Sequence, residues 1–263
     1  MILAIDCGNT HVTFGCMKDG KADRVFRLPT DRRETDFGYA ARIRQVLELA
    51  GVSLNDLCGA VISCVVPQLT RVLESAVRLL LPSVEPLTVG AGVKTGLHIR
   101  INDPGTIASD LVATAVAAKE TYPLPCVIVD LGTATTLTVV DGSGSFIGGT
   151  ILPGAGISLN ALSEEAALLP HISIRAPKKV ISADTVDCMK SGILYGAAGA
   201  IDGLLDRIAE ELGEAPATVV ATGGMAPLIC PVCKHPMILD DQLLLRGLES
   251  VWNRNRKPEA KQF

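Results

Sequence analysis

The sequence is poor in aromatic residues, because only 3% of its side chains belong to Phe, Trp or Tyr. Hydrophobic residues still make up 48% of the chain, so aliphatic side chains must fill the core. A predominance of Ala, Val, Leu and Ile is typical of buried strands covered by helices. The length of 263 residues suits one large domain or two of ordinary size. The composition therefore favours an α/β fold.

The chain also lacks a strong charge of either sign and any long hydrophobic run. A net charge of −4 gives no electrostatic reason to expect nucleic acid or an anionic membrane as a partner. Gly, Pro or a charged residue interrupts each apolar run before it reaches membrane-spanning length. The first residues lead straight into a strand that carries Asp6, so we expect no signal peptide.

A disulfide framework is absent as well, since the eight cysteines are scattered among apolar runs. This usage predicts a reduced protein in the cytoplasm. The run Cys230-Pro-Val-Cys233, followed by His235, could begin a Zn²⁺ site. Because no second Cys pair follows at a suitable spacing, a loop with incidental thiols is the favoured interpretation and a zinc site the minor alternative.

The stretch 127–156 organises the chain. It reads as an apolar strand, a turn with the sequence Asp130-Leu-Gly132-Thr133, and a second and third strand. A similar pattern, Asp6-Cys-Gly8-Asn-Thr, stands near the N-terminus and is separated from the first by close to half the chain. We therefore predict a duplicated fold with domains over residues 1–120 and 121–263.

Three glycine-containing turns could approach a polyphosphate closely. A backbone that binds phosphate needs small residues and inward-facing N–H groups. The turns at residues 6–10 and 130–135 meet this need, and Asp6 could hold Mg²⁺ directly or through water. The third turn, with Gly223 and Gly224, ends a predicted strand where an adenosine could rest on bare backbone. Each turn alone fits a structural role, but the three in this order favour nucleotide binding.

Periodicity places the remaining elements. Apolar residues at helical spacing predict helices over 37–50, 69–81, 106–120, 159–168, 186–212 and 243–254. Apolar or alternating runs predict strands over 2–6, 11–17, 25–28, 59–66, 84–89, 98–101 and 217–222. The polar segment 30–35 suits an exposed loop.

This ordered set of motifs resembles the actin-like ATPase superfamily and, within it, the type III pantothenate kinase family. The matching segments cover nearly the whole chain: DCGNTHVTFG (6–15), KTGL (94–97), DLGTATTLTVVD (130–141), GGTILPG (148–154), TVDCMKSGILYG (185–196) and ATGGMAP (221–227). The resemblance implies a duplicated ribonuclease-H-like α/β fold of two domains, each with a mixed five-stranded sheet and flanking helices. It also implies ATP-dependent phosphorylation of pantothenate to 4′-phosphopantothenate, the first step of coenzyme A biosynthesis, by a homodimer.

The resemblance also assigns roles to residues of the nucleotide site. A first phosphate-binding turn would consist of Asp6, Cys7, Gly8, Asn9, Thr10, His11, Val12 and Thr13. Thr133 would touch the phosphates from the second domain, and Gly223 and Gly224 would support the nucleotide. Asp130 matches the position that holds a monovalent cation, K⁺ or NH₄⁺, while Mg²⁺ would reach Asp6 through the phosphates.

On the substrate side, Asp110 matches the general base that takes the proton from the substrate hydroxyl. Its place at the start of a predicted helix suits that role. Pantothenate would be bound by Ala108, Ser109, Asp110, Leu111 and Thr185, and Thr185 would act across the dimer interface. The first domain would thus supply the base, and the second domain the dimer helix.

The segment before Asp110 departs from the family pattern Tyr-x-x-Pro-x-x-x-Gly-x-Asp-Arg. This chain has Ile101, Ala108 and Leu111 in place of the Tyr, Gly and Arg. Leu111 cannot replace the planar fork that an arginine offers to a carboxylate, although His98 or Arg100 could supply other donors. Two alternatives therefore stay open: a weakly active or inactive nucleotide-binding paralogue with a regulatory role, and a kinase of this fold that acts on another small alcohol.

Overall fold

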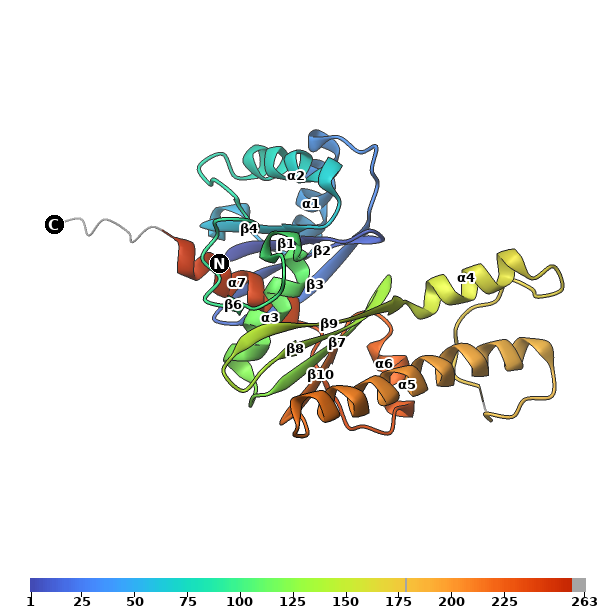
Figure 1. Cartoon of the computed structure of the whole chain (residues 1–263). Coiled ribbons are helices and arrows are strands. Elements are labelled where there is room, and N and C mark those ends of the chain that lie inside the picture. Colours follow the sequence, from blue (N-terminus) through green and yellow to red (C-terminus); the bar gives the residue numbers. More distant parts are fainter. Residues whose placement is uncertain (178, 257–263) are drawn as a thin grey trace. The chain divides into compact units, whose positions relative to one another are not determined.

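The computed structural model describes residues 1–177 and 179–256, which divide into two compact units (Figure 1). The first unit holds residues 1–97, 102–120 and the described residues from Gln242 onward. The second unit holds residues 98–101 and 121–241. One break between the two units falls after residue 120. Residues 98–101 and the last helix each lie in the opposite unit from the predicted domain, because they pair or pack there.

The first unit is built on a mixed sheet with the strand order β3-β2-β1-β4-β5. Its strands are β1 (Ile2–Cys7), β2 (His11–Lys18), β3 (Lys21–Pro29), β4 (Gly59–Cys64) and β5 (Leu87–Thr88). The first three strands pair antiparallel, whereas β4 runs parallel to β1 and β5 runs parallel to β4. The carboxyl ends of β1 and β4 therefore lie side by side.

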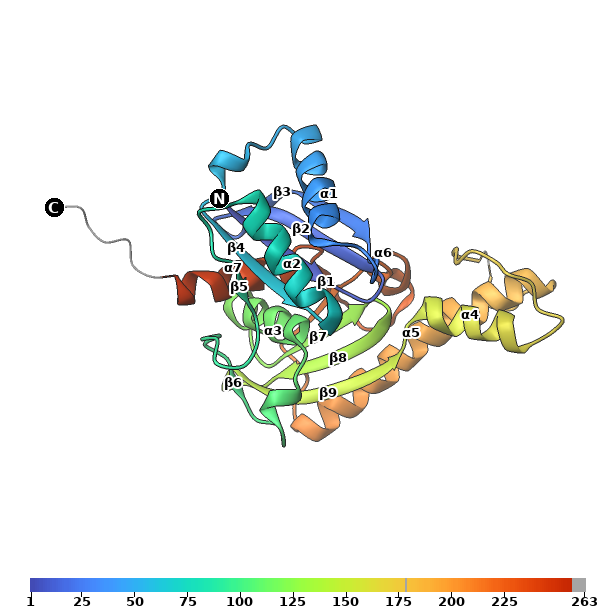
Figure 2. The same cartoon turned by 90° about the horizontal axis from the view of Figure 1, so that it is seen from above.

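Helices cover the first sheet and bury aliphatic side chains against it. The helices of this unit are α1 (Asp36–Leu49), α2 (Pro67–Leu80), α3 (Ser109–Thr121) and α7 (Leu243–Asn255), with short 3₁₀ turns η1 (Leu54–Asp56) and η2 (Pro104–Thr106). Figure 2 shows α1 and α2 side by side over β1, β2 and β4. Side chains of β1, β2, β4, α1 and α2 form one core, with Tyr39 and Phe14 as its largest fully buried members. Helix α7 packs on β1, β2 and β4.

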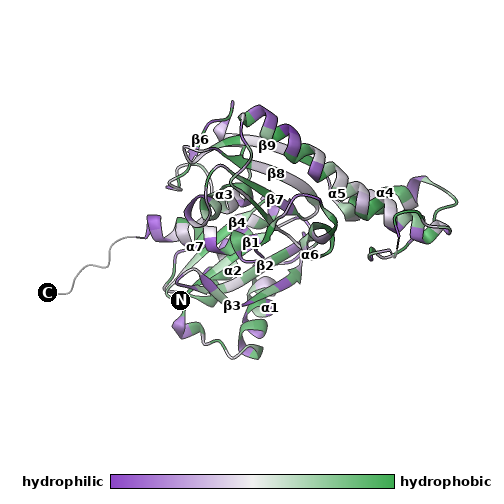
Figure 3. Cartoon of the chain, turned by 90° about the horizontal axis from the view of Figure 1, so that it is seen from below, coloured by the Kyte–Doolittle hydropathy of each residue, from purple (hydrophilic) through white to green (hydrophobic). Residues whose placement is uncertain are grey.

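The second unit repeats this plan. Within the described residues its sheet has the order β11-β10-β7-β8-β9-β6. The strands are β6 (His98–Ile99), β7 (Cys126–Leu131), β8 (Ala134–Val140), β9 (Ser145–Pro153), β10 (Thr218–Thr222) and β11 (Ile238–Leu239). Three strands again pair antiparallel, and β10 runs parallel to β7 as β4 does to β1. The hydrophobic character of β1, β4 and β7 is visible in green in Figure 3.

The helices of the second unit are α4 (Ala155–Glu165), α5 (Thr185–Leu212) and α6 (Ala226–Ile229), with the 3₁₀ turn η3 (Cys230–Val232). Asp184 caps α5 by accepting a hydrogen bond from the backbone N–H of Asp187, and Gly213 ends it at φ +73°. The buried side of α5 packs on β7, β8 and β10. Figures 1 and 2 show α4 and the first turns of α5 extending past the edge of this sheet.

The predicted duplicated α/β fold is confirmed, with three differences of detail. The second sheet gains a sixth strand among the described residues, because β6 pairs with β9. Helix α3 begins at Ser109 instead of residue 106, because Pro104–Thr106 forms a 3₁₀ turn. Helix α4 covers Ala155–Glu165 instead of 159–168, because β9 ends at Pro153 and Gly154 caps the helix. Among the described residues, we find no helix long and apolar enough to cross a membrane.

Candidate active site

The first predicted phosphate-binding turn joins β1 to β2. The backbone N–H of Gly8 donates to the carbonyl oxygen of His11 at 3.0 Å and closes the turn. Asn9, Thr10 and His11 are exposed at its tip, whereas the side chains of Cys7 and Val12 are fully buried in the core. Cys7 and Val12 can therefore offer a ligand only their backbone, and the exposed polar contacts come from the three residues between Gly8 and Val12.

The segment that follows β3 braces this turn. Thr30 Oγ1 donates to the carbonyl oxygen of Gly8 at 2.7 Å, and the Thr30 N–H donates to the carbonyl of Thr10 at 3.0 Å. Arg32 Nη2 donates to Asn9 Oδ1 at 3.1 Å. The sequence indicated only an exposed polar loop here, because the hydrogen-bonded partners lie some twenty positions upstream and form no local motif. We refer to Thr30 and Arg32 as the turn brace.

A chain of hydroxyl groups links Asp6 to the start of α3. Ser63 Oγ donates to Asp6 Oδ1 at 2.8 Å, and its oxygen lies 2.9 Å from Ser109 Oγ. Ser109 Oγ in turn accepts the backbone N–H of Cys64 at 3.2 Å. Two predicted site residues, Asp6 and Ser109, are thus brought together by Ser63, which sequence reasoning missed. Its only signal was a polar residue inside the apolar strand run 59–66.

Asp110 follows Ser109 in the first turn of α3 and is partly buried. Burial raises the pKa of its carboxyl group, while the backbone N–H of Leu111, which donates to Asp110 Oδ1 at 2.7 Å, acts in the opposite direction. The seven residues from Val112 to Ala118 are all buried, so the helix holds Asp110 at a fixed place. A carboxylate with a raised pKa is suited to proton transfer.

A pair of thiols lies next to this group of residues. Cys7, the last residue of β1, is the register partner of Cys64, the last residue of β4. The neighbouring Cys64 thiol and burial raise the pKa of Cys7, whereas the neighbouring Cys7 thiol lowers the pKa of Cys64. Cys7 is fully buried, whereas Cys64 is partly exposed.

In the second unit, three loops meet around Asp130 and the β7–β8 turn that follows it. The β7–β8 turn exposes Gly132 and Thr133, and the backbone N–H of Gly154 donates to the Thr133 carbonyl at 3.1 Å. Gly223 has φ +94°, and a Cβ there would lie 2.6 Å from Asp130 Oδ1. The structure therefore brings Asp130, Thr133 and Gly223 together, with Gly224 exposed beside them. Only glycine fits at position 223, which is why the backbone can approach the carboxylate so closely.

Thr185 is exposed as the first residue of α5, on the turn that Figure 1 shows beyond the sheet of the second unit. Ala108, Ser109 and Leu111 are each partly exposed at the start of α3 in the first unit. His98 and Arg100, which could have supplied other donors, contact the β8–β9 turn instead. His98 Nδ1 lies 3.2 Å from Ser145 Oγ, and Arg100 Nη1 donates to Asp141 Oδ2 at 3.4 Å.

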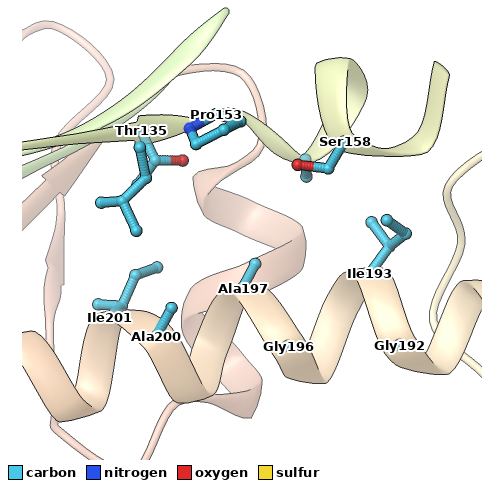
Figure 4. A pocket seen from close by; sticks show the side chains of 11 residues that line it. Thr135, Pro153, Ser158, Gly192, Ile193, Gly196, Ala197, Ala200 and Ile201 are labelled. Atoms are coloured by element: carbon cyan, nitrogen blue, oxygen red, sulfur yellow. The ribbon is translucent and has the colours of Figure 1, made fainter. Parts of the chain in front are cut away.

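A cavity of about 240 Å³ lies between α5 and the segment from β8 to α4 (Figure 4). Small residues of α5, Gly192, Gly196 and Ala200, face Pro153 and Ser158 across it. Exposed aliphatic side chains, among them Ile157 and Ile181, lie on α4 and on the segment before α5. This part of the second unit thus combines a hollow with an apolar surface.

The thiols at Cys230 and Cys233 do not converge with His235. Cys233 Sγ donates to the carbonyl of Ile229, and His235 Nε2 lies 2.8 Å from Asp206 Oδ1. Within residues 1–177 and 179–256, we find no group of three or more His, Cys, Asp or Glu side chains able to hold a metal ion. The minor zinc interpretation gains no support from these contacts.

Comparison with solved structures supports the fold. A Campylobacter jejuni protein named as a Baf family transcriptional activator shares the fold, with a TM-score of 0.60 and 20% identity over 97% of this chain and 98% of that one. Component A of (R)-2-hydroxyglutaryl-CoA dehydratase from Acidaminococcus fermentans does so with a TM-score of 0.56 and 15% identity over 95% of each chain. Both structures share the fold of this chain, so the predicted duplicated α/β fold is confirmed.

Sequence comparison then gives the family. Residues 2–207 match the model for the type III pantothenate kinase family. The type III pantothenate kinase of Bacillus cytotoxicus is 40% identical over 255 residues, which cover 97% of each chain. This chain therefore belongs to the type III pantothenate kinase family. It is a kinase that uses ATP and acts on a small molecule.

Proposed function

We propose that the protein transfers the γ-phosphoryl group of ATP to the hydroxyl group of pantothenate and so forms 4′-phosphopantothenate, the first step of coenzyme A biosynthesis. The observation that carries this proposal is the hydrogen-bonded path from Asp6 through Ser63 to Ser109. This path runs from the end of β1, just before the proposed phosphate-binding turn, to the start of α3, where the partly buried carboxylate of Asp110 follows Ser109. Positioning and charge neutralisation supply most of the catalysis in such a transfer.

In this reaction Asp110 acts as the general base. Its carboxylate takes the proton from the substrate hydroxyl as the hydroxyl oxygen attacks the γ-phosphate. Burial supports this role, because it brings the pKa of Asp110 up from that of an ordinary aspartate. Ala108, Ser109 and Leu111 lie beside it and contact pantothenate, and Thr185 contacts it from α5. Since Leu111 stands where relatives are expected to carry Arg, the carboxylate of pantothenate is held by other donors.

The nucleotide is held by glycine-containing turns in both units. In the first unit, the backbone from Asp6 to Thr13 and the exposed side chains of the turn bind the phosphates. In the second unit, Thr133 contacts the phosphates and the bare backbone at Gly223 and Gly224 supports the nucleotide. The meeting of three loops around Asp130 and the β7–β8 turn supports this assignment.

Two cations assist. Asp6 would hold Mg²⁺ through the phosphates, and the ion would neutralise charge that develops on them. Asp130 would hold a monovalent cation, K⁺ or NH₄⁺, which would reduce repulsion between carboxylate and phosphate. The residues fit such an ion: Thr136 is the register partner of Asp130 on β8, and its buried hydroxyl oxygen lacks a hydrogen-bond partner among the described residues. A cation offers that oxygen a partner.

We also infer that the protein is a homodimer and lies in the cytoplasm. Exposed aliphatic side chains gather between β9 and α5: Ile151, Ile157, Leu162, Leu168, Val180 and Ile181. A second copy would cover this face and bring Thr185 to the site of its partner. All eight cysteines fall in the described part of the chain and are free thiols, which supports a reducing compartment.

A coupled ATP assay tests the activity. Purified protein, ATP, Mg²⁺ and K⁺ should give turnover with pantothenate, and the Asp110→Asn variant should be nearly inactive under the same conditions. Folded protein that shows no turnover at millimolar pantothenate would overturn the proposal. Pantothenate analogues in the same assay expose a kinase for another alcohol, and calorimetry with ATP alone exposes a nucleotide-binding paralogue.

A further inference from the structure

We propose that Cys7 and Cys64 form a reversible disulfide bond when hydrogen peroxide reaches them, and that this bond weakens nucleotide binding by the phosphate turn. The pair would thus be a modification site inside the first unit. The effect on nucleotide binding rests on the proposed function, whereas formation of the bond does not.

The register of β1 and β4 supports the first step of the proposal, which is formation of the disulfide bond. Cys7 and Cys64 are partners at the carboxyl ends of the parallel strands β1 and β4, so their side chains leave the sheet on the same face. Neighbouring strands lie about 4.8 Å apart, within the roughly 4.4–6.8 Å between Cα atoms that a disulfide bond requires. Cys7 belongs to the hydrophobic core of the first unit, and Cys64 packs against that same core. The two cysteines could therefore form a disulfide bond with little movement of the backbone.

The exposure of the two thiols indicates which cysteine reacts with peroxide first and which one then closes the disulfide bond. Cys64 is partly exposed and Cys7 fully buried, so peroxide meets Cys64 first. The Cys64 sulfur attacks one peroxide oxygen, the O–O bond breaks, and the second oxygen leaves with the thiol proton as water, which gives a sulfenic acid. The Cys7 sulfur then attacks the Cys64 sulfur, the S–S bond forms, and the sulfenic hydroxyl leaves with the Cys7 proton as a second water. Two thiols are oxidised and one peroxide is reduced.

The bond would disturb the site because both cysteines adjoin it. Cys7 separates Asp6 from Gly8, and Cys64 follows Ser63 and donates its N–H to Ser109. A disulfide holds its Cβ atoms about 3.8 Å apart, closer than the Cβ atoms of unbonded neighbours on a sheet. The ends of β1 and β4 would be drawn together, which shifts Asp6 relative to Ser63 and alters the turn. A thiol reductant would restore the original arrangement.

The experiment uses the full chain. The protein is treated with a small excess of hydrogen peroxide, and peptide mass mapping locates any disulfide bond; ATP binding is measured by calorimetry before treatment, after it, and after dithiothreitol. We expect a Cys7–Cys64 linked peptide and a loss of ATP affinity of about tenfold or more, reversed by the reductant.

The chain offers a matched control. The double variant Cys230→Ser/Cys233→Ser removes its other closely spaced thiol pair and should respond to peroxide as the natural sequence does. Cys64→Ser, a change of similar volume at a partly exposed site, should bind ATP and keep its affinity after treatment. The proposal is overturned if no Cys7–Cys64 peptide forms, or if Cys64→Ser loses affinity like the natural sequence. Neither readout requires turnover of pantothenate, so a protein that lacks kinase activity would contradict the proposed function alone.

Discussion

Asp6 and Asp130 hold the same position in two related strands. Each is the second-last residue of the central strand of its sheet, β1 in the first unit and β7 in the second. On the antiparallel neighbour, Asp6 is paired with Thr13 and Asp130 with Thr136. On the parallel neighbour, the partners are Ser63 and Thr222. Each carboxylate is therefore flanked by a hydroxyl residue on both sides of its strand.

This equivalence gives Ser63 a role that its neighbours in sequence do not indicate. It is the hydroxyl partner of Asp6 on the parallel strand, as Thr222 is for Asp130. The Ser63 hydroxyl is fully buried and bonded to the carboxylate, so its orientation is fixed before a nucleotide arrives. A site held in this way loses less entropy on binding.

Replacing Ser63 by alanine should lower the catalytic efficiency without unfolding the protein. The change removes a hydrogen bond to a carboxylate, worth about 1.5–3 kcal/mol. If that energy supports the site, kcat/KM for ATP should fall by about 10- to 100-fold. Steady-state kinetics measure the effect. Ser250→Ala is the matched control, because Ser250 Oγ also donates to a carboxylate, Glu120 Oε1, at 2.8 Å in the same unit. Equal losses for both variants would contradict the role of Ser63.

Replacing Gly223 by alanine should disturb Asp130 directly. A Cβ at this position would lie 2.6 Å from Asp130 Oδ1 and 2.6 Å from the Leu131 carbonyl oxygen. Gly213→Ala is the control, because Gly213 has φ +73° but no atom within 4 Å of an added Cβ. Both variants bear the backbone cost of about 1–2 kcal/mol. Only Gly223→Ala should also lose activity and its response to K⁺, as measured by turnover over a K⁺ titration; activity loss of equal size in both would overturn this prediction.

The pH dependence should report Asp110. Burial raises its pKa above the ordinary 3.8, so the base is protonated at a higher pH than an exposed aspartate would be. Activity should therefore fall on acidification with an acid limb above pH 3.8. The effect of Asp110 on stability has the opposite sign to that of a salt-bridged carboxylate. Because its pKa is higher in the folded protein than in the unfolded chain, Asp110 stabilises the fold below the unfolded pKa. This stabilisation is lost as the pH rises through the folded pKa.

The Asp110→Asn variant separates the effect of Asp110 on catalysis from its effect on stability. It should lower kcat by about 10²–10⁴-fold, since it removes the base. At neutral pH it should raise the melting temperature relative to the natural sequence, and this gain should shrink toward acid pH because the natural carboxyl is then neutral too. Asp56→Asn, at an exposed aspartate of η1, should change neither property. A melting temperature that falls at neutral pH for Asp110→Asn would show that burial of its charge is not costly.

The sequence alone could reveal the features of the fold and site that depend on residues close together in the chain. Asp6, Gly8, Asp130 and Gly223 stand in short motifs whose residue types follow from turn geometry and phosphate chemistry, so the sequence alone could predict them as candidate site residues. The strands and most helices follow from periodicity, because a buried face imposes a period of two or 3.6 residues.

The sequence could not reveal contacts between distant segments. Ser63 meets Asp6 only because β4 pairs with β1 across a crossover, and β6 joins the second sheet only through β9. Helix α7 follows residue 241 in the chain but packs on the first sheet. Such pairings depend on the packing of whole elements, which leaves no motif in the segments themselves.

The oligomeric state should depend on the aliphatic face between β9 and α5. Ile157→Glu combined with Ile181→Glu introduces two charges into that face, where the side chains are 46% and 89% exposed. Burying a charge without a partner is costly, so a dimer that uses this face should dissociate. Sedimentation velocity measures the change. Phe37→Glu with Leu49→Glu places equal charge on exposed apolar residues of the first unit and should leave the dimer intact. A double Ile157/Ile181 variant that remains dimeric would contradict the assignment.

The turn brace should affect nucleotide affinity more than turnover. Arg32 Nη2 bonds to the Asn9 side chain at the exposed tip of the phosphate turn, and Thr30 Oγ1 bonds to the Gly8 carbonyl. Thr30→Val keeps the shape of the side chain but loses the hydroxyl, and Arg32→Ala loses the link to the tip. Each net hydrogen bond contributes about 0.5–1.5 kcal/mol, so KM for ATP should rise by about two- to tenfold for each variant, with a smaller change in kcat. Arg33→Ala removes the same charge one residue along the chain, so it controls for a general electrostatic effect. If Arg33→Ala raises KM as much as Arg32→Ala, attraction of the nucleotide by positive charge explains the result, and the hydrogen bond to Asn9 does not.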